Sequence, residues 1–336
     1  MEKFNWFLGV DVSKDTLDLS LFVGTTSIDY RQIENSPASV RSYFKQIKTE
    51  FKVQLAECLV CLEHTGIYNN HLLDTGLKLG LKIWVESALA IKLSCGISRV
   101  KNDKVDSAKI AVYAYRFQDK AKLWEPSNPT IELLNQLSKQ REKLLKVRHQ
   151  LEVSIGEKTL FMEKTLVKRI KDAIARPLKA VKVAIKALDA QIDEILNTDE
   201  QIKCKAKIIT SVPGVGKVTA VKLIVTTNLF MNINDPRKYA CYGGVAPFES
   251  TSGTSVRGKM QVSKKANLSV KALLSLCATS AIAHDPELRG FYLRKVEEGK
   301  NKMSVINAVR NKIIHRIFAC VNQNRMFEMN YQNSLA

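Results

Sequence analysis

The order of apolar segments in the first 120 residues constrains the fold more than any other feature of the chain. Residues 6–10 form a continuous apolar run, and residues 16–22 alternate between polar and apolar side chains. A third strand-like segment covers residues 27–32. Three such segments in succession predict three strands joined as a meander, so the chain is expected to begin with a sheet.

Helices and strands alternate after this meander. A helix is expected from Ser36, because Pro37 is well placed in a first helical turn. The remaining expected elements are strands over residues 58–62 and 82–85 and helices over residues 68–79, 88–93 and 104–118. This order is that of a ribonuclease H-like α/β domain, in which the first and fourth strands are neighbours.

The middle of the chain predicts two long helices. Pro126 and Pro129 interrupt the α/β pattern, and about seventy residues of helical periodicity follow. The apolar positions before Pro177 are Leu133, Leu137, Leu144, Val147, Leu151 and Ile155, and those after it are Leu178, Val181, Ile185, Leu188, Ile192 and Ile195. Such a seam predicts either a helical hairpin that packs on itself or an intermolecular coiled coil, and we expect it to join protomers.

From Cys204 onward the chain is mostly helical, with one interruption rich in glycine, serine and threonine at residues 243–258. We therefore expect an α/β domain over residues 1–125, a helical coiled-coil linker over residues 126–203, and a mostly helical domain over residues 204–336. The fold class is α/β plus α.

Several features favour a cytoplasmic protein. No apolar stretch approaches the ~18–20 residues that a membrane span needs, and the N-terminus has no signal-peptide layout. The seven cysteines are scattered and odd in number, which suits a reducing compartment. Cys58 and Cys61 lie in an apolar run and are expected to be core thiols.

The charge is divided unequally along the chain. The whole chain has 52 basic and 33 acidic residues, a net charge of +19. Residues 1–125 contain 17 basic and 15 acidic residues, whereas the remaining 211 residues contain 35 and 18. This asymmetry predicts a polyanionic partner for the second half, and nucleic acid is the expected one.

Four carboxylates fall where a ribonuclease H-like sheet would bring them together. Asp11 ends the first apolar strand, and Glu63 ends the fourth. Asp103 and Asp106 are three residues apart at the start of a predicted helix, so they share a face. Converging carboxylates repel one another unless cations bind them, and oxygen ligands suit Mg²⁺ or Mn²⁺. Taken singly, each carboxylate is more simply a turn or helix-cap residue.

A glycine-rich turn precedes a predicted helix at Pro213. Its Gly214, Gly216 and Lys217 suit contact with backbone phosphates through exposed amides. A Walker A loop is excluded, because Lys217 is followed by Val218 instead of Ser or Thr. An ordinary turn between helices is the alternative.

The second glycine-rich segment, residues 242–253, contains Ser250, Thr251 and Ser252. A hydroxyl there would have basic residues nearby to hold a phosphate. Those basic residues are Arg257, Lys259, Lys264 and Lys265. Composition alone favours a plain Ser/Thr-rich turn.

With these motifs in order, the chain resembles the DEDD transposases of the IS110 insertion-sequence family, to which the pilin-gene-inverting recombinases are related. The motifs that carry the resemblance are G-V-D-V-S-K at Asp11, E-H-T-G-I-Y at Glu63, K-N-D-K-V-D at Asp103 and Asp106, P-G-V-G-K-V-T-A at Pro213, and Y-G-G-V-A-P…S-G ending at Ser252 and Gly253. Ala266 stands where family members often have glycine.

The resemblance implies a RuvC-like N-terminal domain whose four carboxylates bind metal, and a C-terminal transposase domain whose Ser252 attacks DNA and becomes covalently linked to it. Ser250 and Thr251 remain rival nucleophiles. It also implies donor and target DNA paired through a bridge RNA, and a dimer of dimers in which one protomer's carboxylates meet another's serine. The turn at residues 213–219 resembles a helix-hairpin-helix contact with DNA.

Two other functions are compatible with the sequence. A RuvC-like junction endonuclease would hydrolyse DNA with water and would need the carboxylates alone. A non-catalytic nucleic-acid-binding scaffold would need neither the carboxylates nor the serine.

Overall fold

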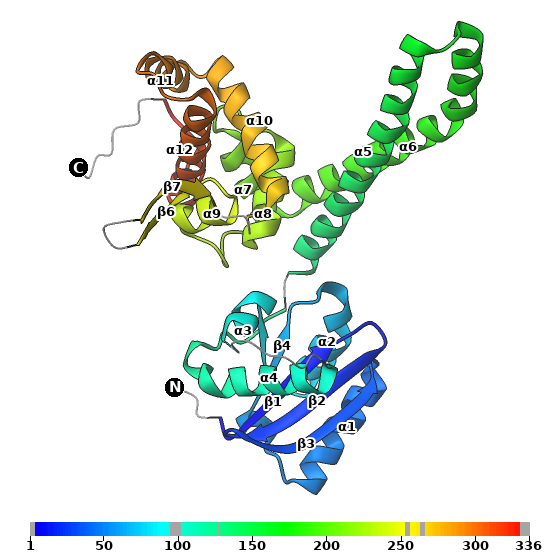
Figure 1. Ribbon diagram of the computed structural model, residues 1–336, viewed down its shortest axis with the longest axis vertical. Coiled ribbons are helices and arrows are strands. Elements are labelled where there is room, and N and C mark those ends of the chain that lie inside the picture. The colour runs from blue at the N-terminus through cyan, green and yellow to red at the C-terminus, as the bar shows by residue number, and fades with distance from the viewer. Residues whose placement is uncertain (1–3, 95–101, 127, 253–255, 263–265, 330–336) are drawn as a thin grey trace. The chain divides into compact units, whose positions relative to one another are not determined.

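The computed structural model describes residues 4–94, 102–126, 128–252, 256–262 and 266–329, and these residues divide into two compact units, Met1–Pro126 and Ser127–Ala336. Each unit has its own elements (Figure 1). No helix in the described part of the chain is long and apolar enough to cross a membrane.

The N-terminal unit is a five-stranded mixed sheet with helices on both faces. Its strands are β1 (Trp6–Val12), β2 (Thr16–Val23), β3 (Thr26–Glu34), β4 (Cys58–Glu63) and β5 (Lys82–Glu86), in the order β3-β2-β1-β4-β5. The first three strands pair antiparallel, and β4 lies parallel to both β1 and β5. The expected meander and the adjacency of the first and fourth strands are therefore confirmed.

The helices that cover the sheet in the described part of this unit are α1 (Pro37–Glu50), α2 (Asn70–Lys78), α3 (Ala88–Ser94) and α4 (Asp103–Arg116). Short 3₁₀ turns lie at Leu55–Glu57, Gly66–Asn69 and Gln118–Lys120. Ser36 caps α1 by accepting a hydrogen bond from the Ser39 amide, and Pro37 occupies the first turn as predicted. Helices α1 and α2 cover one face of the sheet, whereas α3 and α4 cover the other.

Strand periodicity determines which side chains belong to each face of the sheet, because successive side chains point to opposite sides. Leu8 and Val10 of β1 pack in the core beneath α1 and α2, whereas Phe7 packs in the core beneath α4. In β4, Val60 and Leu62 belong to the first core, and Cys61 belongs to the second. Cys58 and Cys61 are both fully buried, as expected of core thiols.

In its described residues, the second unit is helical except for one hairpin. Its helices are α5 (Pro129–Phe161), α6 (Lys164–Thr198), α7 (Glu200–Thr210), α8 (Lys217–Thr227), α9 (Pro236–Tyr242), α10 (Leu268–His284), α11 (Pro286–Glu297) and α12 (Lys302–Asn322). The glycine-rich segment expected to interrupt the helices holds two antiparallel strands, β6 (Pro247–Ser252) and β7 (Val256–Val262). Sequence patterning did not predict this hairpin.

Helices α5 and α6 pack against each other within the chain. Arg141 forms an ion pair with Asp189 at 2.5 Å, and Lys182 forms one with Glu152 at 3.0 Å. The two helices reverse direction at residues 162–163, and Pro177 lies inside α6. Self-packing of the hairpin does not address whether it also joins protomers.

Only part of the predicted seam is buried within the single chain. On α6, Ile185 and Ile192 are buried as expected. On α5, Leu133 is 52% exposed and Val147 is 40% exposed, while Ile131 and Leu134 are buried. The first turns of α5 pack against α8 and the later helices. The side chains buried there therefore differ from those that a single heptad repeat predicts.

Candidate functional site

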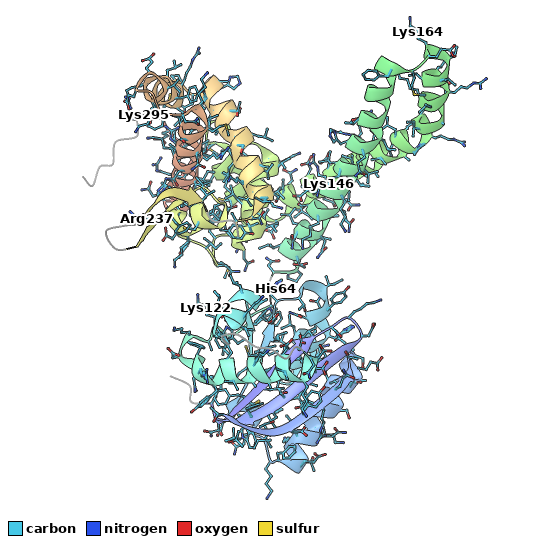
Figure 2. All side chains as sticks on the ribbon, viewed as in Figure 1. His64, Lys122, Lys146, Lys164, Arg237 and Lys295 are labelled. Atoms are coloured by element: carbon cyan, nitrogen blue, oxygen red, sulfur yellow. The ribbon has the colours of Figure 1, made fainter. Side chains whose placement is uncertain are left out.

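Two strand ends bring Asp11 and Glu63 to one edge and one face of the sheet. Val10 of β1 pairs with Leu62 of β4, and the two carboxylates are the next residues in each strand. Asp11 lies an even number of residues from Phe7 and Glu63 lies two from Cys61, and both of those residues pack beneath α4, so the two carboxylates lie on the α4 face. Both are partly exposed, and Glu63 is followed by His64, which is labelled in Figure 2.

Helix α4 supplies Asp103 and Asp106 from its first turn. Asn102 caps the helix by accepting a hydrogen bond from the Val105 amide at 2.8 Å. The helix approaches β1 very closely, because a Cβ added at Gly9 would lie 2.1 Å from the Ser107 carbonyl oxygen. Gly9, two residues before Asp11, therefore permits the approach that brings Asp103 and Asp106 near Asp11.

The four carboxylates interact electrostatically. Burial, followed by the negative charges of Asp103, Glu63 and Asp106, raises the pKa of Asp11 to about 6. Burial and the charge of Asp106 also raise the pKa of Glu63. Mutual repulsion of this kind arises when acidic groups gather in a partly desolvated place.

A fifth carboxylate, Asp18, was not predicted. It lies directly across from Asp11 in the β1–β2 register and is 2% exposed. The Tyr30 hydroxyl donates to it at 2.6 Å, and the Gln32 amide donates at 3.2 Å. In the sequence Asp18 occupies a polar position of an alternating strand, and that signal does not distinguish a buried acid from an exposed one.

The donor set fits a divalent cation of the Mg²⁺ or Mn²⁺ type. Carboxylate oxygens are the ligands these ions prefer, and a cation would relieve the repulsion that raises the pKa of Asp11. In the described residues, no three acidic, histidine or cysteine side chains already stand at the spacing of a metal site. Carboxylates without a cation repel one another, which fits this spacing. A bound ion at these residues therefore stays a prediction.

The glycine turn before α8 has a structural role that the sequence did not distinguish from phosphate binding. Gly214 has a φ of +83°, and a Cβ there would lie 2.5 Å from the Cys277 carbonyl oxygen on α10. Gly216 is the N-cap of α8, with open space around its Cα. The Lys217 ammonium lies 2.5 Å from Asp193 on α6, so any phosphate would compete with that carboxylate.

Ser252 is the last residue of β6 and pairs with Val256 across the hairpin. Arg257 and Lys259 belong to β7. The side chains of Ser250, Thr251, Ser252, Arg257 and Lys259 lie outside the described part of the structure, as do Lys264 and Lys265 entirely. The assignment of Ser252 over Ser250 or Thr251 thus stays a prediction.

Two family models match the chain. A DEDD transposase model of IS110 type matches residues 8–157, and the Transposase IS116/IS110/IS902 family model matches residues 206–293. The first range contains all four predicted carboxylates, and the second contains Ser252 and the glycine turn at Pro213.

Similar proteins include the pilin gene-inverting protein of Moraxella lacunata, 24% identical over 96% of this chain and 97% of that protein. The insertion element IS110 43.6 kDa protein of Streptomyces coelicolor is 30% identical over 46% of this chain and 37% of that protein. Among solved structures, Thermus thermophilus RuvC in complex with a Holliday junction is 11% identical, covers 35% of this chain and 99% of its own, and has a TM-score of 0.29.

Proposed function

Because this chain carries both transposase domains of the IS110/IS116/IS902 family and is homologous to pilin gene-inverting proteins, we propose that it cuts and rejoins the DNA of a mobile element. The enzyme class is a DNA transposase or recombinase. The observation that carries the proposal is the gathering of Asp11, Glu63, Asp103 and Asp106 at one edge of the N-terminal sheet, where burial and the charges of the other three carboxylates raise the pKa of Asp11.

In this proposal the four carboxylates hold Mg²⁺ or Mn²⁺. The bound ions would supply Lewis-acid stabilisation of the attacking and departing oxygens at phosphorus. The chain's own contribution is to hold the carboxylates in place. Gly9 lets α4 approach β1, Asn102 caps α4, and the Ser20 hydroxyl bonds to that of Ser107 at 2.8 Å, linking β2 to the same helix.

Ser252 is the proposed nucleophile. Its hydroxyl would lose a proton and bond to phosphorus, while the bond from phosphorus to a sugar oxygen breaks and that oxygen gains a proton. The phosphoserine ester keeps the bond energy, so a second attack by a sugar hydroxyl can rejoin DNA without an external energy source. Arg257 and Lys259, which follow on β7, would neutralise developing charge.

The proposal also includes the RNA that guides recombination and the oligomeric state of the protein. Donor and target DNA would be selected through base pairing with a bridge RNA, and such specificity leaves little trace in the protein sequence. The chain would act in the bacterial cytoplasm as a dimer, or as a dimer of dimers during recombination. Helices α5 and α6, whose outer positions include exposed Val147, would contribute to assembly.

Two substitutions test the chemistry against matched controls. Asp11→Asn and Ser252→Ala should each abolish the covalent adduct and the recombinant product while DNA binding persists. Asp15→Asn removes a nearby exposed carboxylate, and Ser250→Ala removes a rival hydroxyl, so both should retain substantial activity. Proteolysis and mass spectrometry of the trapped adduct identify the linked residue.

Other outcomes of this experiment point to the alternatives. An adduct on Ser250 or Thr251 would move the nucleophile within β6. Cleavage by the unmodified chain without any adduct would support a junction endonuclease that uses water. Binding without cleavage in Mg²⁺ and Mn²⁺ would support a non-catalytic scaffold.

A further inference from the structure

Helix α12 carries two mostly buried arginines that differ in their partners. Arg316 donates to Asp285 and to Glu287, each at 2.5 Å. Arg310 is 6% exposed, and its Nη1 donates to the amide oxygen of Asn307 at 3.2 Å. Arg316 thus shows how this fold compensates a buried guanidinium, and Arg310 lacks that compensation.

Arg310 has no carboxylate partner among the residues that the structure describes. Its buried Nε also has no hydrogen-bond partner there. Burial lowers the pKa of Arg310, and no neighbouring acid opposes the change. A buried charge without a counter-charge destabilises the free protein, so an unpartnered guanidinium of this kind indicates a site where a ligand supplies the negative charge.

The position of Arg310 relates it to the β6–β7 hairpin. Asn307, its partner, donates to the Val245 carbonyl at 2.7 Å, and Val245 lies two residues before β6. At the other end of the hairpin, the Asn267 amide and side chain both bond to Tyr242, each at 2.8 Å. Hydrogen bonds from α12 and from the start of α10 therefore fix the chain just before β6, at Val245 and at Tyr242 respectively.

We propose that Arg310 is an anion-binding residue at the base of the hairpin and that its ligand is a backbone phosphate of a nucleic-acid strand. A guanidinium matches phosphate with a two-pronged set of donors. Residues 126–336 have an excess of 17 positive charges, which favours a polyanion over an acidic side chain of another protein. The inference rests on the proposed function only in taking nucleic acid as the partner.

The test uses the full chain and labelled double-stranded DNA of arbitrary sequence. Arg310→Met should weaken binding roughly tenfold and lower the log–log salt slope by about one. Lys312→Met is the matched control, because it removes a positive charge two residues away whose ammonium lies over the Phe291 ring at 4.8 Å. The control should keep both the affinity and the slope.

A stability measurement separates binding from a structural role. Without ligand, Arg310→Met should raise the melting temperature by roughly 2–4 °C, because it removes an uncompensated buried charge. Inorganic phosphate should raise the melting temperature of the unmodified chain and of Lys312→Met, but not that of Arg310→Met. If Arg310→Met does not fold, Arg310→Lys serves instead. It keeps the positive charge but loses the two-pronged donor set of the guanidinium, and it should bind DNA at least threefold more weakly.

Three results would overturn the proposal. The first is an Arg310→Met protein whose affinity and salt slope equal those of Lys312→Met. The second is a lower melting temperature with unchanged DNA binding. The third is unchanged DNA binding with a reduced mass by light scattering, which would assign the anion to a carboxylate of a second copy. A chain that forms no adduct but keeps the Arg310-dependent slope would overturn the proposed function alone.

Discussion

The two units use their charged residues in opposite ways. In the N-terminal unit, basic and acidic residues nearly balance, yet Asp11 and Glu63 have no ion-pair partner among the described residues. In the second unit, carboxylates such as Glu142, Asp189 and Asp285 are ion-paired, although basic residues outnumber acidic ones by 17. The first unit therefore concentrates negative charge in one place, and the second spreads unpaired positive charge.

This difference suits a division of labour. A gathered set of acids suits cations and chemistry at phosphorus, whereas spread positive charge suits the long-range attraction of a polyanion. Figure 2 shows four of the cations of the second unit, Lys146, Lys164, Arg237 and Lys295, on four different helices. No single helix carries the excess, so we expect contact with nucleic acid over an extended surface.

The largest expected effect concerns salt. If the second unit contacts six to ten phosphates, the affinity of the full chain for DNA should fall by roughly 10³–10⁵-fold between about 50 and 200 mM salt. A fragment of residues 1–126, which contains both cores of the sheet, should bind weakly with a slope near zero. Fluorescence anisotropy with labelled DNA measures both slopes, and circular dichroism checks that the fragment is folded.

Equal salt slopes for the fragment and the full chain would show that the second unit does not supply the phosphate contacts. A slope near zero for the full chain would contradict nucleic-acid binding through the second unit altogether.

The N-terminal site was more predictable from sequence than the second unit. Asp11 and Glu63 follow apolar strands whose adjacency depends only on strand order, and Asp103 and Asp106 start a recognisable helix. Gly9 and Asp18 were missed, because a close approach of backbone and a buried acid depend on what packs opposite, which patterning in one segment does not contain.

The second unit was less predictable because its elements have several partners. α5 packs on α6 through Arg141 and on α8 through Glu142, so two different stripes of the helix are buried. A heptad pattern describes one partner only, which is why Leu133 of the predicted seam lies outside the packed face of the hairpin in the single chain. The hairpin was missed because glycine, serine and threonine are as common in loops as in short exposed strands.

A medium effect is expected from adding a methyl group at Gly9. Gly9→Ala would place a Cβ against the Ser107 carbonyl, and this overpacking should destabilise the N-terminal unit by about 1–3 kcal/mol. Gly156→Ala is the control in the second unit, because a Cβ there meets nothing within 4 Å. That control should stabilise α5 by roughly 0.5–1 kcal/mol, since alanine has the higher helix propensity. Urea unfolding measures both changes.

If Gly9→Ala unfolds at the same urea concentration as the unmodified chain, α4 does not need the glycine for its approach. The placement of Asp103 and Asp106 would then have another cause.

The smallest effect on stability, and the sharpest test of assembly, concerns the α5–α6 hairpin. Charged substitutions at Ile185 and Ile192 would be uninformative, because both side chains are buried within the chain and a charge there would destabilise the hairpin whether or not it joins protomers. Val147 and Phe161 are 40% and 88% exposed, so Val147→Glu with Phe161→Glu should change the free energy of unfolding by less than about 0.5 kcal/mol.

If these exposed apolar positions join protomers, the double substitution puts charge into an apolar contact and should lower the mass measured by light scattering to that of one chain. Gln140→Glu with Ala187→Glu adds the same two charges at other exposed positions of α5 and α6 and should leave the mass unchanged. An unchanged mass in the first variant would mean that the hairpin packs on itself alone. The difference between the units would then lie in charge and chemistry, with no role for these helices in holding protomers together.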